Sequence, residues 1–112
     1  MVLEEFHVKE EDAVRVPEEN LRTTVTALFE KVGVPRADAE LGADVLVSAD
    51  LRGVDSHGVS NMLRSYISGY GEGRLNPRPN WSIIRETPAV ANIECDGGLG
   101  IIIAPKAMEI AI

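Results

Sequence analysis

Residues 49–59 read Ala-Asp-Leu-Arg-Gly-Val-Asp-Ser-His-Gly-Val and join two stretches of helical periodicity. Gly53 is expected to end the first helix, because glycine readily adopts the left-handed conformation that closes a helix. Ser56, an effective N-cap residue with Asp55 beside it, is expected to begin the next helix. The segment therefore predicts a tight turn between two helices, with Ser56 and His57 at the start of the second.

Apolar side chains recur at helical spacing on both sides of this turn. An amphipathic helix is predicted over residues 18–32, where Pro17 and two glutamates suit a first turn. A second helix is predicted over residues 35–53, with a stripe of small and branched residues that lets another helix approach closely. The third is predicted over residues 56–71 or 56–73. Its expected buried face comprises Val59, Met62, Leu63, Tyr66, Ile67 and Tyr70.

The periodicity changes after the third predicted helix. Strands are predicted at residues 81–84 and 89–93, joined as a hairpin, and a further helix is predicted at residues 104–112. The predicted fold class is α/β, seen within these residues as α+β. We expect a helical N-terminal region at residues 1–75 and the beginning of a mixed α/β nucleotide- and substrate-binding domain at residues 76–112.

The two ends of the chain carry less regular patterns. Residues 6–8 and 14–16 alternate and could form an edge strand or an extended arm. Residues 107–112 are helical and apolar but contain no glycine, cap residue or charged last turn, and two strands make a poor sheet by themselves. We therefore expect a truncated part of a longer polypeptide; the alternative is a complete small domain with a frayed end.

Composition limits the class of protein. The chain has 112 residues, 11 basic against 18 acidic, and a net charge of -7, which disfavours nucleic acid and anionic membrane surfaces as partners. The sequence has neither a secretory signal nor an apolar run of ~18 residues. The single cysteine, Cys95, cannot form an intrachain disulfide. These features lead us to expect a cytoplasmic protein without membrane segments.

His57 is the leading candidate for chemistry. A helix N-terminus disfavours a positively charged imidazole, and the neutral ring donates one hydrogen bond and accepts another. Such a ring could orient a substrate hydroxyl or carbonyl oxygen, while N–H groups of the same turn could hold a carboxylate. The alternative is a capping turn with an incidental histidine.

Other polar candidates are less specific. His57, Asn61 and Arg64 stand at i, i+4 and i+7 and would share one helix face. Arg64 could bind a substrate carboxylate through two hydrogen bonds, or be solvated. The cluster at residues 97–100 is not a dinucleotide fingerprint, since Ile103 stands where a third glycine is required, and is interpreted as a structural turn. Two distant histidines and one cysteine have no metal-ligand spacing, so no metal site is expected.

Residues 49–59 resemble the signature near the N-terminus of the type-2 malate/L-lactate dehydrogenase family, which includes ureidoglycolate and sulfolactate dehydrogenases and cyclic imino acid reductases. Residues 33–35, 75–79 and 96–100 fit the same family. The resemblance implies an NAD- or NADP-dependent oxidoreductase that moves hydride between nicotinamide and a 2-hydroxy (or 2-imino) acid such as malate or lactate. It also implies a homodimer and a nucleotide-binding domain of the family's own topology.

The resemblance also assigns site residues. Ser56 and His57 match residues that line the substrate and nicotinamide pocket, which gives His57 a catalytic, cofactor-contacting role; Arg52 and Arg64 become candidates for substrate binding. The family's principal acid/base histidine and most cofactor contacts lie downstream. Many relatives have arginine where this chain has Asn61, and Arg64, one turn further, could take its place. The alternative is a catalytically silent helical module that dimerises.

One residue limits where the last predicted helix can begin. Pro105 follows the glycine cluster closely. It must lie in the first turn of that helix, or it costs ~3 kcal/mol or more by removing a backbone hydrogen bond.

Overall fold

The computed structural model describes residues 8–112. Phe6 and His7, part of one predicted extended piece, lie outside the described residues. Residues 14–16 form neither a strand nor a helix. The helices and strands are a short 3-10 turn at Glu10–Asp12, α1 (Glu18–Lys31), α2 (Arg36–Leu51), a second 3-10 turn at Asp55–His57, α3 (Val59–Gly71), β1 (Ser82–Glu86), β2 (Ala91–Glu94) and α4 (Gly100–Ala111).

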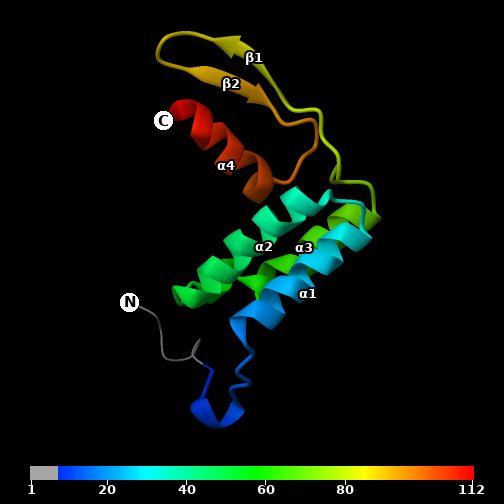
Figure 1. Ribbon diagram of the computed structural model, residues 1–112, viewed down its shortest axis with the longest axis vertical. Helices are drawn as coiled ribbons and strands as arrows, with labels where there is room; N and C mark the ends of the chain where they lie inside the picture. Colours follow the sequence, from blue (N-terminus) through cyan, green and yellow to red (C-terminus); the bar gives the residue numbers. More distant parts are fainter. Residues whose placement is uncertain (1–7) are drawn as a thin grey trace.

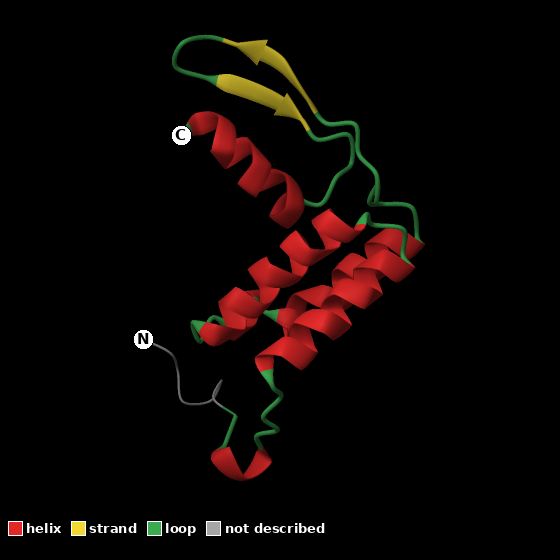
Figure 2. Ribbon diagram, in the orientation of Figure 1, coloured by secondary structure: helices red, strands yellow, loops and turns green. Residues whose placement is uncertain are grey.

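The first three α-helices lie together, and the chain then crosses to a hairpin and α4 at one end of them (Figures 1 and 2). A helical region followed by a small antiparallel sheet confirms the predicted α/β fold class, seen within these residues as α+β. Within residues 8–112, no helix combines the length and apolarity needed to cross a membrane.

The core forms where α1, α2 and α3 meet. Phe29 of α1 is fully buried and meets Tyr70 of α3 edge-on, with ring centroids 6.3 Å apart. A Cβ on Gly42 of α2 would lie 3.1 Å from the Phe29 ring and 3.4 Å from Ile102. The absence of a side chain at Gly42 therefore lets α1 and α4 pack closely against α2, as expected of a small-residue stripe.

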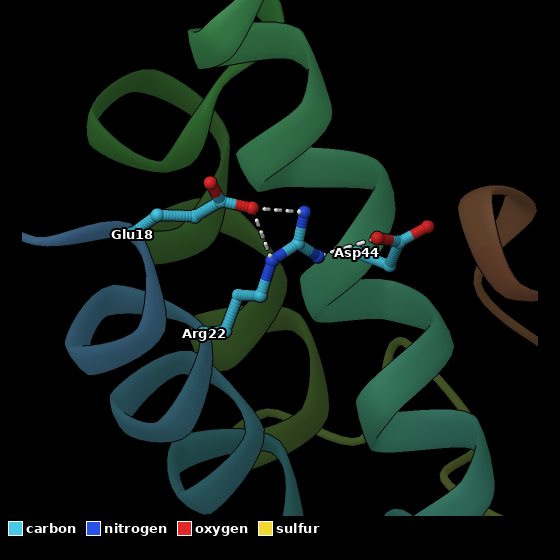
Figure 3. Close-up of polar contacts among 3 residues, drawn as sticks. All are labelled: Glu18, Arg22 and Asp44. Carbon is cyan, nitrogen blue, oxygen red and sulfur yellow. Dashed lines mark hydrogen bonds and ion pairs between the residues drawn. The ribbon is translucent and has the colours of Figure 1, made fainter.

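A polar bridge at the surface joins α1 to α2 (Figure 3). Arg22 donates to Glu18 one turn earlier at 2.9 Å and also contacts the carboxylate of Asp44 in α2. Both hydrogen bonds raise the pKa of the Arg22 guanidinium, and the bond to Glu18 has the larger effect. Because the groups are largely exposed, the bridge orients the two helices more than it stabilises them.

The last helix begins four residues earlier than predicted. It starts at Gly100, so Pro105 lies in its second turn and not in its first. The missing N–H costs about 3 kcal/mol. Burial of Ile102 and Ile103, worth about 1.5–3 kcal/mol each, offsets that cost. Lys106 adds a half-buried ion pair to Asp38 of α2 at 2.5 Å.

The two strands pair antiparallel, with Ser82 opposite Glu94 and Glu86 opposite Ala91. The prediction placed the second strand at residues 89–93, but residues 89 and 90 belong to the connecting turn. There Thr87 N–H donates to the Val90 carbonyl at 2.8 Å. Both strands are therefore shifted toward the C-terminus by one or two residues from their predicted starts.

Tyr70 sets an expected dependence of stability on pH. Burial first, and then the Asp38 carboxylate, raise the pKa of the Tyr70 phenol to about 12. Tyrosine in an unfolded chain titrates at about pH 10, so below that pH the phenol is protonated in both states and stability does not change with its titration. Between about pH 10 and about pH 12 only the unfolded chain loses the proton, and stability therefore falls as the pH rises. We expect a loss of roughly 2 kcal/mol in unfolding free energy across this window.

Urea unfolding of the chain and of Tyr70→Phe at several alkaline pH values measures this loss. The variant should lose less stability than the wild-type chain over the same window, because it has no phenol to ionise. Equal losses in the two proteins would show that Tyr70 does not cause the dependence.

Candidate functional site

Gly53 closes α2 as predicted. It has a left-handed φ of 72°, its N–H donates to the Asp50 carbonyl at 3.0 Å, and Val54 N–H donates to the Ala49 carbonyl at 2.9 Å. This pair of bonds satisfies the last carbonyls of α2 and turns the chain sharply. Residues 55–59 therefore return toward the end of the same helix.

The prediction that Ser56 caps α3 was wrong. Ser56 and His57 form a 3-10 turn, Gly58 is the N-cap, and α3 begins at Val59. The capping side chain is Asp50 of α2, whose Oδ2 accepts a hydrogen bond from Val59 N–H at 3.0 Å. A carboxylate is a strong acceptor beside the positive end of a helix dipole. The N–H that could have held a substrate carboxylate is thus used by the chain itself.

The space at this junction leaves no room for a side chain at position 58. The φ of Gly58, -88°, is open to any residue, but a Cβ there would lie 1.7 Å from Asp50 Oδ1 and 2.4 Å from the carboxylate carbon. The carboxylate therefore occupies the volume that any larger residue at position 58 would need. We call Asp50, Ser56, His57, Gly58 and Val59 the motif turn.

The Ser56 hydroxyl contacts the His57 ring. Ser56 Oγ lies 2.9 Å from His57 Nδ1, and both side chains are exposed. If Nδ1 accepts this bond, Nε2 carries the proton and can donate; if Nδ1 donates, Nε2 can accept. Among residues 8–112 no hydrogen bond engages Nε2. His57 can therefore offer one oriented ring nitrogen to an oxygen atom of a ligand.

Asn61 holds the turn from the other side. Its Nδ2 donates to the Ser56 carbonyl at 2.6 Å. His57 does not share a helix with Asn61 and Arg64 as predicted, because it ends the 3-10 turn that precedes α3. The sequence did not predict the roles of Asp50 and Asn61. The one indication was Gly58, because a glycine there suggests that another group occupies the place of its side chain.

Among residues 8–112, neither of the two candidate arginines makes a side-chain hydrogen bond to this network. Arg64 is an exposed residue of α3, and Arg52 is the C-cap of α2. Neither forms an ion pair within the part of the chain that the structure describes. Arg52 lines a surface hollow with Asp44, Val45, Ser48, Ala49 and Val54. Their roles in substrate binding stay predictions.

The glycine cluster serves as a structural turn, as interpreted from the sequence. Asp96 has a left-handed φ of 50°. Its carboxylate accepts hydrogen bonds from Asn80 N–H at 2.8 Å and Asn76 Nδ2 at 3.1 Å. These bonds fasten the linker after α3 to the turn before α4. Within residues 8–112, no group of three or more potential metal ligands gathers.

Comparison with known proteins identifies the fold. The solved structure of malate dehydrogenase from Pyrococcus horikoshii superposes with a TM-score of 0.86 at 42% identity, over 94% of this chain and 30% of that one. The curated malate dehydrogenase of the same organism is 43% identical over 92% of this chain and 28% of its own length. The L-sulfolactate dehydrogenase of Methanocaldococcus jannaschii is 44% identical over 84% of this chain and 27% of its own.

Both the fold and the sequence of this chain are thus similar to part of malate and L-sulfolactate dehydrogenases. The family model for malate/L-lactate dehydrogenase matches residues 16–112, and the chain belongs to that family. This confirms the resemblance predicted from residues 49–59. The chain spans only about 28% of the length of the curated relatives it matches.

Proposed function

We propose that this chain is the N-terminal, substrate-side portion of an oxidoreductase that transfers hydride between NAD or NADP and a 2-hydroxy acid such as malate or lactate. Family membership and the names of the relatives, which are malate and sulfolactate dehydrogenases, support the reaction class. The observation that carries the proposal is the motif turn. It presents an exposed histidine whose Nδ1 is already engaged by Ser56.

The residues of this chain would orient the substrate. His57 Nε2 lies free of protein hydrogen bonds in the described part of the chain, and would bond the oxygen on the substrate carbon that gains or loses hydride. Arg64 or Arg52 would hold the substrate carboxylate, since a guanidinium binds it through two parallel bonds. The cofactor supplies the hydride. The glycine cluster at residues 97–100 lacks the dinucleotide fingerprint, and most cofactor contacts would come from the rest of the family polypeptide.

The same proposal covers the assembly and location of the complete protein. We propose a homodimer in the cytoplasm, acting on a small 2-hydroxy or 2-oxo acid; a 2-imino acid is the related alternative. The chain's net charge of -7 supports neither nucleic acid nor an anionic membrane as partner.

Fluorescence titration with NADH and NADPH tests the proposal. The protein is this chain joined to the C-terminal region of Pyrococcus horikoshii malate dehydrogenase that it does not match. We expect saturable enhancement of nicotinamide fluorescence with at least one of the two cofactors. Absence of binding in a folded chimera would contradict the proposal and favour the silent, dimerising helical module.

A further inference from the structure

The His57 side chain is exposed, so burial does not fix the direction of its ring. An exposed side chain exchanges rotamers within nanoseconds unless a bond holds it. Among residues 8–112, the contact that can hold this ring is the one between Nδ1 and Ser56 Oγ, which lie 2.9 Å apart. Ser56 is exposed as well. The direction in which Nε2 points therefore depends on what fixes Ser56.

Ser56 lies at the centre of the short 3-10 turn before α3. Such turns are held by hydrogen bonds of poorer geometry than those of an α-helix; here His57 N–H donates to the Val54 carbonyl at 3.0 Å. The Ser56 carbonyl accepts its bond from a side chain instead, Asn61 Nδ2 at 2.6 Å. A residue of α3 thus holds the turn from outside.

Asn61 is a firm anchor for this bond. It is the third residue of α3, and the two residues after it, Met62 and Leu63, pack against the core. The first N–H of α3 is bonded to the Asp50 carboxylate of α2 at 3.0 Å. The Asn61 amide nitrogen also lies 3.8 Å from Met62 Sδ, which further restricts its orientation. The anchor is therefore fixed to the helices and not to the turn that it holds.

We propose that Asn61 is a positioning residue for His57. Its bond to the Ser56 carbonyl fixes the turn in the form that brings Ser56 Oγ to Nδ1, and Nε2 is then presented to a ligand oxygen in one direction. A reaction slows when a reacting group is held less well, even if the group itself is intact. The inference rests on the proposed function only for the ligand that Nε2 meets; the order of the ring does not depend on it.

The alternative role of Asn61 is to stabilise the folded chain and nothing more. A hydrogen bond between a side chain and a turn carbonyl can do this and leave His57 unaffected. The two roles are separable, because stability is measured by unfolding, whereas positioning changes the ring and the turnover number of a protein that is still folded. Asn61→Leu removes the amide donor, keeps a similar shape and adds no charge.

Nuclear magnetic resonance of the chain tests the positioning without any activity. The chain has two histidines, His7 and His57, and a His7→Gln background leaves the signals of His57 alone. Three-bond couplings report the torsion χ1 of its side chain. We expect the couplings of one dominant rotamer when Asn61 is present, and values averaged over several rotamers in Asn61→Leu. Unchanged couplings in a folded Asn61→Leu chain would overturn the proposal.

Steady-state kinetics of the chimera with the Pyrococcus C-terminal region test the consequence for the reaction. Asn61→Leu should lower kcat roughly tenfold, less than removal of the imidazole itself, because the ring is present but points correctly for only part of the time. KM for the 2-oxo acid should change by less than about twofold, because the contacts to the substrate carboxylate are unaffected. An active, folded variant whose kcat is unchanged, whatever its stability, would contradict the positioning role.

Asn20→Leu is the matched control. Asn20 is the third residue of α1, as Asn61 is of α3, and both are exposed. Within residues 8–112 the Asn20 amide makes no hydrogen bond; Thr24 bonds its backbone carbonyl. Asn20→Leu should therefore leave the couplings and kcat unchanged, and equal effects of the two changes would count against the proposal. Circular dichroism confirms that each variant folds; Asn61→Asp with Asn20→Asp replaces the pair if Asn61→Leu does not.

These outcomes are separate from the fate of the proposed function. The couplings need no cofactor, so a freed His57 ring in Asn61→Leu, together with a chimera that binds neither NADH nor NADPH, would retain the positioning role and remove the oxidoreductase assignment. An active chimera in which folded Asn61→Leu keeps both its kcat and its ordered ring would do the opposite.

Discussion

Gly58→Ala should destabilise the chain by roughly 1–2 kcal/mol, a marked effect for the addition of one methyl group. The new Cβ would lie 1.7 Å from Asp50 Oδ1, so the carboxylate must leave its place over α3. That displacement removes the cap on Val59, and loss of such a cap costs about 0.5–2 kcal/mol. Urea unfolding of the variant and the wild-type chain measures the difference.

A double-mutant cycle with Asp50 shows whether the carboxylate is the cause. Asp50→Ala alone should cost about 1 kcal/mol, as expected for loss of an N-cap. The double variant should be scarcely less stable than Asp50→Ala, because the methyl group added at position 58 then has room. Gly71→Ala is the control: no atom lies within 4 Å of a Cβ at that position of α3, and the change should be neutral or slightly stabilising. Additive effects at positions 50 and 58 would contradict this explanation.

His57→Ala should lower turnover by roughly 10²–10³-fold in the chimera with the C-terminal region of the Pyrococcus enzyme. The expected loss is that of one oriented hydrogen bond to an oxygen that gains charge in the transition state. The unfolding free energy should change by less than about 0.5 kcal/mol, because the side chain is exposed. Steady-state kinetics and urea unfolding are measured on the same preparation.

Ser56→Ala provides the graded comparison. It leaves the imidazole in place but removes the hydroxyl that lies 2.9 Å from Nδ1, so turnover should fall less than in His57→Ala. A large stability loss in His57→Ala with an unchanged turnover number would show that His57 is only a structural member of the turn.

The sequence predicted those parts of the fold that depend on local patterns. Helical spacing placed the start of α1 at Glu18, where it is observed. Gly53 marked the end of α2, because the turn there requires a residue in the left-handed conformation, which glycine adopts readily. The start of α3 could not be found in this way. Its cap comes from Asp50, nine residues before Val59, and becomes visible only when the chain has turned back on α2.

The early start of α4 escaped prediction for a related reason. Pro105 argued for a helix that begins close to it, but burial of Ile102 and Ile103 against the earlier helices decides where the helix begins. In the candidate site, too, local features could be predicted and contacts that depend on the fold could not. Ser56 and His57 were singled out by their place in a glycine-flanked turn. The hydrogen bond from Asn61 to the Ser56 carbonyl depends on the observed bend and not on helical spacing.

Transfer of deuterium is the most direct test of the assignment as a hydride-transferring enzyme. The chimera is incubated with oxaloacetate or pyruvate and NADH or NADPH carrying deuterium at nicotinamide C4, and the product is analysed by mass spectrometry. We expect malate or lactate with one deuterium on the carbon that bears the hydroxyl, and a reduced yield in the His57→Ala variant. A folded, cofactor-binding chimera that leaves every 2-oxo and 2-imino acid tested unlabelled would contradict the account.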